Sequence, residues 1–213
     1  TNKIEKYESL VRIIDEEGKV ISPFFFLDIA KKGRYYTQIT QQVINNSFLA
    51  LEKTTKGISI NLGATDIEDD FIRDIILKYL EKNQEKASRI VFELLEDESV
   101  KDFNTITEFI QKVKSYGVKI AIDDFGAGYS NFERLLHFAP DILKIDGSLI
   151  KNIHKDMYSR DIVETIQNFA TKLGIKTVAE FVYCQEVLDV VNEIGIDYTQ
   201  GYHISEPKAS IEE

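Results

Sequence analysis

The sequence predicts an α/β fold, a variant of the (β/α)8 TIM barrel, and three observations favour it. Short β-branched runs recur along the chain, and helical patterns of apolar residues follow several of them. These units continue from the first residues to Tyr202 without a glycine-rich dinucleotide fingerprint. Three prolines and no low-complexity stretch leave no linker, so residues 1–213 are expected to form one domain. An open, doubly wound sheet also fits the alternation, and the barrel is the favoured interpretation.

The expected strands are short and separated by helix-length segments. The first apparent strand runs from Tyr7 to Ile13, and later strands are expected over residues 58–62, 90–94, 118–122, 142–145 and 175–179. Apolar residues at helical spacing predict helices across residues 71–80, 103–113 and 187–194, and Gly117 and Gly195 are expected to end the last two. A complete barrel usually needs about 250 residues, so one N-terminal strand is expected to be missing from this chain.

Composition limits the classes of partner. The net charge of -10 and the pI of about 4.9 argue against binding to a nucleic acid polymer, because no basic stripe is available to displace counterions. An anionic substrate is still compatible with this charge where bound cations reverse the local field. The single Cys184 suits a reducing compartment, and the longest apolar cluster, Pro23 to Leu27, is too short to cross a bilayer. We therefore expect a cytoplasmic domain without a membrane segment.

Polar residues recur at one place in the predicted units, near the carboxyl end of each strand. In a barrel these ends converge on one mouth, where catalytic groups of this architecture collect. The recurrence is what favours a functional site, because a structural role for each residue does not predict the same location in successive units. The residues are Asn61, Glu93, Asp123, Asp124, Lys144, Glu180 and Gln200, with Glu8 inside the first run.

Each of these residues also has a structural interpretation of its own. Glu8 is compatible with the solvated face of an edge strand, and Asn61 with a turn. Glu180 could begin the next helix as an acid in its first turn, and Lys144 could extend its ammonium group to solvent. Glu93 lies between two apolar residues, where an unpaired carboxylate is costly, and it therefore favours function more than the others do.

The adjacent carboxylates of Asp123 and Asp124 are the most informative pair. They follow the apolar run of residues 118–122, where like charges repel and lose hydration, so a cation is expected to compensate them. A strand-ending turn is the structural alternative. Hard oxygen ligands favour Mg²⁺ or Mn²⁺, and the scattered histidines lack zinc-binding spacing. Two such ions, roughly 3.5–4 Å apart, suit in-line displacement at phosphorus, with a lysine and a glutamate to steady and deprotonate the water.

With these residues the chain resembles the EAL-domain cyclic di-GMP phosphodiesterases over essentially its whole length. The name motif Glu-Ala-Leu is present as Glu8-Ser9-Leu10, followed by Val11 and Arg12. The ordered set is far more specific than any one short motif. The other matching segments are Ser22-Pro23, Phe26-Leu27, Ile60-Asn61-Leu62, Glu93-Leu94-Leu95-Glu96, Asp123-Asp124-Phe125-Gly126-Ala127-Gly128-Tyr129-Ser130, Leu143-Lys144-Ile145-Asp146, Val178-Ala179-Glu180 and Gln200-Gly201-Tyr202.

The resemblance implies hydrolysis of cyclic di-GMP to linear pGpG with two Mg²⁺ or Mn²⁺ ions in a (β/α)8 barrel variant. It implies that Lys144 orients the water and that Glu180 is the general base. Arg12 and Gln200 would lie near the substrate. The implied metal ligands are Glu8, Asn61, Glu93, a bridging Asp123, and Asp124 at the second ion.

The resemblance also implies regulation. Phe125, Gly126, Ala127, Gly128, Tyr129 and Ser130 match a regulatory loop that helps to form the second metal site and the contact of a homodimer. Glu96 would tether that loop. Domains of this family often follow sensor or diguanylate-cyclase (GGDEF-type) modules, so the chain is expected to be a fragment of a longer signalling protein, which could be attached to a membrane through regions outside this chain.

Three departures from the family pattern leave an alternative open. Ser9 replaces the central Ala of the name motif, and Ala127 stands where Thr is usual. Residues 181–184 replace the usual Gly-Val-Glu-Thr with Phe-Val-Tyr-Cys, which affects support of the base and the loop. A catalytically silent receptor for cyclic di-GMP that signals through a partner is therefore the second hypothesis. A Mg²⁺-dependent barrel enzyme acting on a sugar phosphate is the third, and it does not explain the ordered motifs.

Overall fold

In this computed structural model, residues 3–33, 35–95, 102–128, 135 and 137–211 are described. The strands are β1 (Lys6–Ser9), β2 (Ile13–Ile14), β3 (Val20–Ile21), β4 (Gly57–Asn61), β5 (Ile90–Leu95), β6 (Lys119–Phe125), β7 (Ile142–Ile145), β8 (Lys176–Ala179) and β9 (Tyr198–Thr199). The helices are α1 (Pro23–Lys32), α2 (Tyr36–Leu51), α3 (Ala64–Glu68), α4 (Asp70–Lys82), α5 (Gln84–Ala87), α6 (Phe103–Ser115), α8 (Gly147–Ile150), α9 (Met157–Leu173) and α10 (Gln185–Ile194).

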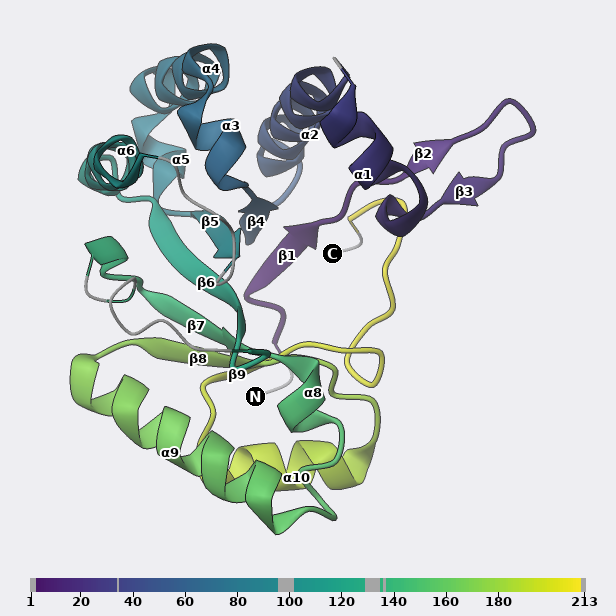
Figure 1. Cartoon of the computed structure of the whole chain (residues 1–213), viewed down its shortest axis with the longest axis vertical. Coiled ribbons are helices and arrows are strands. Elements are labelled where there is room, and N and C mark those ends of the chain that lie inside the picture. Colours follow the sequence, from purple (N-terminus) through teal and green to yellow (C-terminus); the bar gives the residue numbers. More distant parts are fainter. Residues whose placement is uncertain (1–2, 34, 96–101, 129–134, 136, 212–213) are drawn as a thin grey trace. The chain divides into compact units, whose positions relative to one another are not determined.

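The strands confirm the α/β class and the parallel sheet of a (β/α)8-barrel variant. Seven of them are hydrogen-bonded in the order β1-β4-β5-β6-β7-β8-β9, and the pairs β1–β4, β6–β7, β7–β8 and β8–β9 are parallel. Helices lie between β1 and β4, between β4, β5 and β6, and between β7, β8 and β9, as parallel pairing requires (Figure 1). The chain divides into two compact units, and the boundary falls inside β5, so each unit is described by itself.

The first unit contains residues 3–92, 102–118 and 210–211 of the described chain, and the second contains residues 93–95 and 119–209. In the first unit, β1 and β4 pair with Glu8 opposite Ser59 and Ser9 opposite Ile60. Helix α4 buries Ile72, Ile76 and Leu80, which recur every four residues and so form one apolar stripe.

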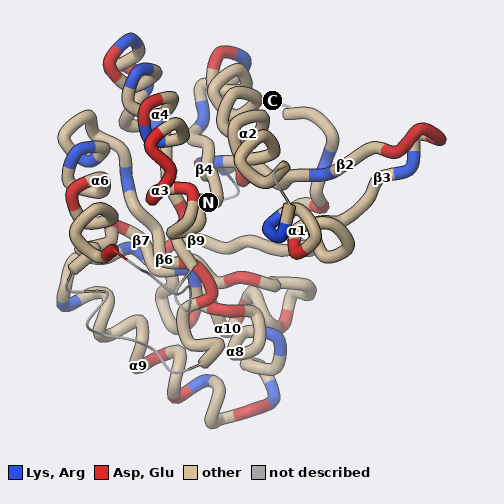
Figure 2. The backbone as a smooth tube through the Cα atoms, turned by 45° about the horizontal axis from the view of Figure 1, so that its top comes forward, with Lys and Arg blue, Asp and Glu red and all other residues tan. Residues whose placement is uncertain are grey.

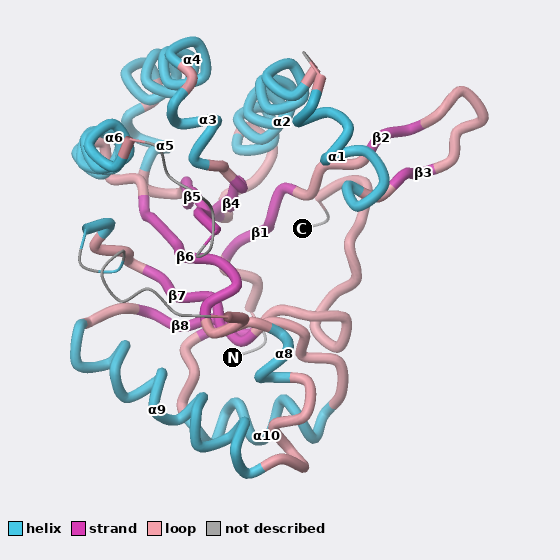
Figure 3. The backbone as a smooth tube through the Cα atoms, viewed as in Figure 1, coloured by secondary structure: helices cyan, strands magenta, loops and turns pink. Residues whose placement is uncertain are grey.

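The predicted first strand is wrong in its extent. The parallel strand ends at Ser9, and Ile13–Ile14 belongs to β2, which pairs antiparallel with β3 in a separate hairpin. Figure 3 shows this hairpin as two short magenta segments joined by a loop. The segment from Tyr7 to Ile13 therefore does not form one strand. Its beginning is hydrogen-bonded to β4 and its end to β3, so the backbone groups are satisfied by two different strands.

A buried carboxylate ties α2 to the start of α3 in the first unit. Asp66 accepts hydrogen bonds from the Tyr36 hydroxyl (3.0 Å), the Thr40 hydroxyl (2.8 Å) and the Gly63 backbone N–H (2.8 Å). Burial raises the pKa of Asp66 above its ordinary value of 3.8, although these three donors act in the opposite direction. The network holds the loop that follows Asn61.

The second unit is built around β6 to β9, with α9 packed against β8 and α10 packed against α9 (Figure 1). Its core includes Ile145, Val163, Val182 and Val191, all fully buried. Gly195 ends α10 in the left-handed conformation, as predicted. The predicted helix-ending role of Gly117 is likewise confirmed, because Gly117 follows α6 with φ 95°.

Charged residues of both signs are spread along the described chain. Figure 2 shows Lys and Arg (blue) and Asp and Glu (red) on helices and loops throughout the described chain, and the sequence as a whole has an excess of acidic residues. Among the described residues, the helices are too short or too polar to cross a lipid bilayer.

Candidate metal centre

A buried lysine lies at the centre of the predicted site in the second unit. The Lys144 ammonium nitrogen is 2.6 Å from Oε2 of Glu93, 2.8 Å from Oδ1 of Asp123 and 3.0 Å from Oε1 of Glu180. The side chains of Lys144 and Glu93 are at most 1% exposed. Since β5, β6, β7 and the end of β8 each supply one of these groups, the expectation that strand ends gather them is confirmed within this unit.

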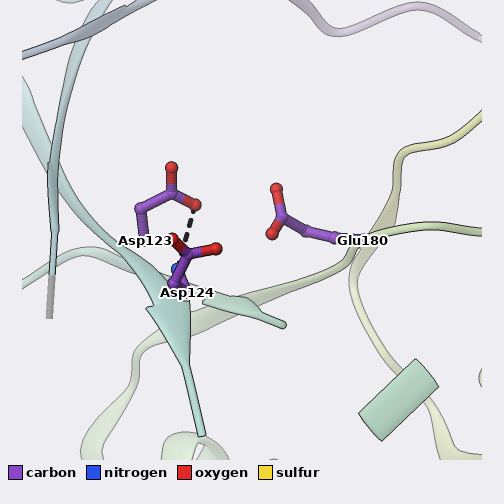
Figure 4. A group of neighbouring side chains, drawn as sticks. All are labelled: Asp123, Asp124 and Glu180. Carbon is purple, nitrogen blue, oxygen red and sulfur yellow. Dashed lines mark hydrogen bonds between the residues drawn. The ribbon is translucent and has the colours of Figure 1, made fainter. Parts of the chain in front are cut away.

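Asp124 extends this cluster towards solvent. One carboxylate oxygen from each of Asp123, Asp124 and Glu180 lies within 4.8 Å of the others, and Figure 4 shows the three side chains turned toward one another. Asp123 is buried, Glu180 is half-buried and Asp124 is exposed. Oxygen ligands at this spacing could hold a hard cation such as Mg²⁺ or Mn²⁺.

The charge of the cluster favours a bound cation. Among the described residues, Glu93, Asp123 and Glu180 contact the Lys144 ammonium group, and Asp124 lies beside Asp123 and Glu180. Carboxylate oxygens are the ligands that hard divalent cations prefer, and a cation beside several carboxylates reduces their mutual repulsion. The donor set therefore fits a divalent metal ion, with Asp123, Asp124 and Glu180 as the residues placed to hold it.

An irregularity in β6 positions the two aspartates. The register between β6 and β7 shifts between Ile122 and Phe125, which is the signature of a bulge. Asp124 has φ 56°, and its backbone N–H donates to Oδ1 of Asp123 at 3.1 Å. Because a bulge removes the strict alternation of side chains, two consecutive carboxylates can serve one site. The sequence predicts that the strand ends at Ile122, before the two aspartates. This prediction is wrong, because β6 runs through both aspartates to Phe125.

The segment after β8 positions Glu180. The Glu180 backbone N–H donates to the carbonyl of Ile145 at 3.2 Å, and the Val182 N–H donates to the carbonyl of Gln200 at 3.0 Å. Phe181 lies between these two fixed residues with φ 57°, a left-handed conformation that bulky residues rarely adopt. Residues in such conformations cluster at functional sites.

Gln200 is fixed through its neighbour Gly201. A Cβ atom at Gly201 would lie 2.3 Å from the carbonyl oxygen of Val182, so only glycine allows this approach. The Gln200 backbone N–H also donates to the carbonyl of Ala179 at 2.9 Å. The predicted substrate residue and the predicted base are therefore carried by backbone segments that are hydrogen-bonded to each other.

Two further predicted ligands meet in the first unit. The side-chain amide of Asn61 donates to Oε1 of Glu8 at 2.9 Å, and their strands β1 and β4 are parallel neighbours. This pairing satisfies the amide through its NH₂ group and leaves its carbonyl oxygen for another partner. Arg12 also lies in this unit and donates to the backbone carbonyl of Val11. The joint action of these residues with Glu93 and Asp123 stays a prediction.

The predicted regulatory loop is described only in part. Phe125 is buried, Gly126 has φ 93°, and the Ala127 N–H donates to the carbonyl of Asp124 at 3.1 Å, which closes a turn. Among the described residues, no atom lies within 4 Å of a Cβ placed on Gly128. Glu96, Tyr129 and Ser130 lie outside the described residues.

Sequence reasoning did not anticipate two features of this centre. One is that Glu180 joins the aspartates as a group able to hold a metal ion. The other is the left-handed backbone of Phe181, although the usual Gly at this position was a signal, since glycine is the residue that favours positive φ.

A parallel βα fold with an acidic cluster around a buried lysine defines the class of protein, and comparison with known proteins gives the family. The EAL domain model matches residues 1–207, so the chain belongs to the EAL domain family. It is 33% identical over 211 residues to the cyclic di-GMP phosphodiesterase PdeF of Escherichia coli, covering 97% of this chain and 28% of that protein. It is 30% identical over 213 residues to the cyclic di-GMP phosphodiesterase PdeB of Shewanella oneidensis, covering 98% and 25%.

A solved structure supports the same assignment. The PaMucR phosphodiesterase in complex with c-di-GMP matches with a TM-score of 0.85 and 26% sequence identity, over 96% of this chain and 85% of that one. The chain spans about a quarter of the length of the two curated relatives.

Proposed function

We propose that this EAL domain hydrolyses one phosphodiester bond of cyclic di-GMP to give linear pGpG. The observation that carries the proposal is the contact of Lys144 with Glu93, Asp123 and Glu180, next to Asp124. The names of two relatives and of one similar structure point to the same substrate.

The oxygen-rich donor set of Asp123, Asp124 and Glu180 supports a metal requirement. Asp123, Asp124 and Glu180 would hold one ion, and Glu8, Asn61 and Glu93 would share Asp123 at another. Bound Mg²⁺ or Mn²⁺ supplies Lewis acidity and lowers the pKa of a coordinated water. The remaining chemistry belongs to side chains of this chain.

Lys144 would hold the attacking water and the developing negative charge. Its ammonium group is fixed by three carboxylates, so its position is set before the substrate binds, and one of its three protons would have to turn from a carboxylate to the water. Glu180, 3.0 Å from that nitrogen and partly exposed, would accept the proton of the water. The spacing of its carboxylate from Asp123 and Asp124 also supports Glu180 as a metal ligand.

Several partners belong to the proposal as well. Arg12 would bind a phosphate of the nucleotide, and Gln200 would contact it from the segment paired with Val182. The loop that begins at Phe125 would regulate the second ion and form the contact of a homodimer. With these roles, the domain would act in the cytoplasm as the output domain of a longer signalling protein.

Product analysis tests the activity. Purified protein is incubated with cyclic di-GMP and Mn²⁺, with and without a chelator, and the products are separated by chromatography. Metal-dependent pGpG is expected, and it should be lost in Asp124→Asn and kept in Asp74→Asn, an exposed aspartate of α4. Binding of cyclic di-GMP without turnover would replace the enzyme with a silent receptor. If the protein neither binds nor hydrolyses cyclic di-GMP, the third hypothesis, a Mg²⁺-dependent enzyme acting on a sugar phosphate, is reopened.

A further inference from the structure

The short helix α8 touches both loops that carry the acidic cluster. Its first residue, Gly147, lies against Phe181, which directly follows Glu180. Its residue Leu149 lies against Gly126, which follows Asp124 and Phe125. The Asp146 backbone N–H, just before the helix, donates to the carbonyl of Phe125 at 3.1 Å.

The contact at Gly147 leaves no room for a side chain. A Cβ atom there would lie 2.7 Å from Cβ of Phe181 and 3.3 Å from its Cγ. The Phe181 Cβ is attached directly to the backbone, so it cannot move aside without moving the peptide that carries Glu180. At Gly126 the closest atom is instead Cδ1 of Leu149, the far end of a flexible side chain, which can turn away. The Gly147–Phe181 contact is therefore the stiffer of the two.

Phe181 has little freedom to adjust. Hydrogen bonds fix the backbone on both sides of it, at Glu180 and at Val182, and its φ of 57° is already in a sparsely populated region. A push on its Cβ is therefore transmitted to Glu180. Since Glu180 contacts Lys144 and has an oxygen within 4.8 Å of oxygens of both aspartates, a small displacement would change the spacing of the oxygen ligands.

We propose that Gly147 and Phe181 are a complementary positioning pair, in which a phenylalanine after Glu180 requires a glycine at the start of α8. The pair sets the distance of Glu180 from Asp123 and Asp124 and thereby the affinity of the metal site. This inference rests on the proposed metal centre. It assigns no role in substrate contact to either residue.

The test compares Mn²⁺ binding in four proteins without nucleotide. Free Mn²⁺ is measured by electron paramagnetic resonance for the wild type, Gly147→Ala, Phe181→Gly and the double variant, and thermal unfolding is followed in parallel. Gly147→Ala should weaken binding about tenfold or more, as supporting residues of metal sites do. In the double variant, which lacks the opposing Cβ, binding should return to within about threefold of Phe181→Gly. Ser148→Ala, an exposed neighbour in α8, is the matched control and should bind as the wild type does.

The other possible outcomes of this experiment either support or overturn the proposed pair. Wild-type affinity in Gly147→Ala, or an equal loss in the single and double variants, would overturn the pair. If Gly147→Ala fails to fold, recovery of folding in the double variant supports the direct contact, and failure of both overturns it. A wild type that binds no Mn²⁺ would overturn the metal centre, while the unfolding midpoints of the four proteins would still report the Gly147–Phe181 coupling separately.

Discussion

The Lys144 ammonium nitrogen lies 2.6 Å from Oε2 of Glu93, and both side chains are withdrawn from solvent. Asp123 and Glu180 contact the same nitrogen, so one lysine organises acids from β6 and from the end of β8. Buried ion pairs contribute little net stability but are strongly destabilising when one partner is removed. The lysine should therefore matter for folding as well as for chemistry.

Replacing this lysine tests its role as a counter-charge. Lys144→Met should lower the free energy of unfolding by about 3–5 kcal/mol in the absence of metal, because Glu93 is left buried without its partner. Added Mn²⁺ should restore part of the loss. Urea unfolding measures both effects. Lys78→Met, which removes an exposed partner of Asp74, should change stability little, and an equal loss in the two variants would contradict the assignment.

The exposed aspartate of the cluster should act on metal binding and not on folding. Asp124→Asn removes one charged ligand, so the Mn²⁺ concentration at half-saturation should rise about tenfold or more. The unfolding midpoint without metal should stay close to that of the wild type, because Asp124 is exposed. Titration calorimetry gives the affinity. Unchanged affinity would remove Asp124 from the ligand set.

Glu180 can be tested as a base separately from its test as a ligand. Glu180→Gln keeps the shape and one oxygen but cannot accept a proton, so kcat should fall by about 10²–10⁴-fold. Mn²⁺ binding should weaken less than in Asp124→Asn if proton transfer is the main role. Pre-steady-state turnover and Mn²⁺ titration on the same sample distinguish the two roles of Glu180. A near-normal kcat would exclude Glu180 as the proton acceptor.

The buried carboxylate of Asp66 should make stability depend on pH. Burial raises the pKa of Asp66 above 3.8 in the folded protein, so the folded state holds this proton more tightly than the unfolded state does. Its favourable contribution is complete below pH 3.8 and is lost as the pH rises through the folded-state pKa. Asp66→Asn cannot ionise, and its amide can keep hydrogen bonds with Tyr36, Thr40 and Gly63.

The measurement is the difference in unfolding free energy between Asp66→Asn and the wild type across the acidic range. This difference should move in favour of the variant as the pH increases above 3.8 and then level off. Taking the difference cancels the other titrating groups. A difference that does not vary with pH would show that Asp66 has an ordinary pKa.

Gly201 should be intolerant of even one methyl group. An added Cβ would lie 2.3 Å from the Val182 carbonyl oxygen, which is a backbone atom held by the His203 N–H at 3.0 Å. Gly201→Ala should therefore lower the free energy of unfolding by about 2 kcal/mol. Gly128→Ala, whose added Cβ meets no atom of the described residues within 4 Å, is the control in thermal unfolding, and similar midpoints for both variants would argue against the close approach.

Much of the second unit could be predicted from residue types. A lysine and a glutamate flanked by apolar neighbours in strands, as Lys144 and Glu93 are, cannot both be buried unless they meet, and they do. The adjacent aspartates predicted a compensating cation, and the Lys144 ammonium group lies 2.8 Å from Asp123, whereas a metal ion at this place stays a prediction. These inferences succeed because the cost of burying a charge does not depend on details of the backbone.

Features set by the backbone were not accessible in the same way. The bulge in β6 and the left-handed Phe181 depend on hydrogen bonds to distant segments, such as that from Val182 to Gln200. The first strand was extended too far because β-branched residues continue past Ser9 while the pairing partner changes. Local propensity carries no information on which partner a strand finds.

Anomalous diffraction from crystals grown with Mn²⁺ shows whether the acidic cluster holds a metal ion. We expect an Mn²⁺ peak within coordination distance of Asp123, Asp124 and Glu180. Peaks only at surface carboxylates away from Lys144, or no peak near Asp123 at saturating Mn²⁺, would contradict it.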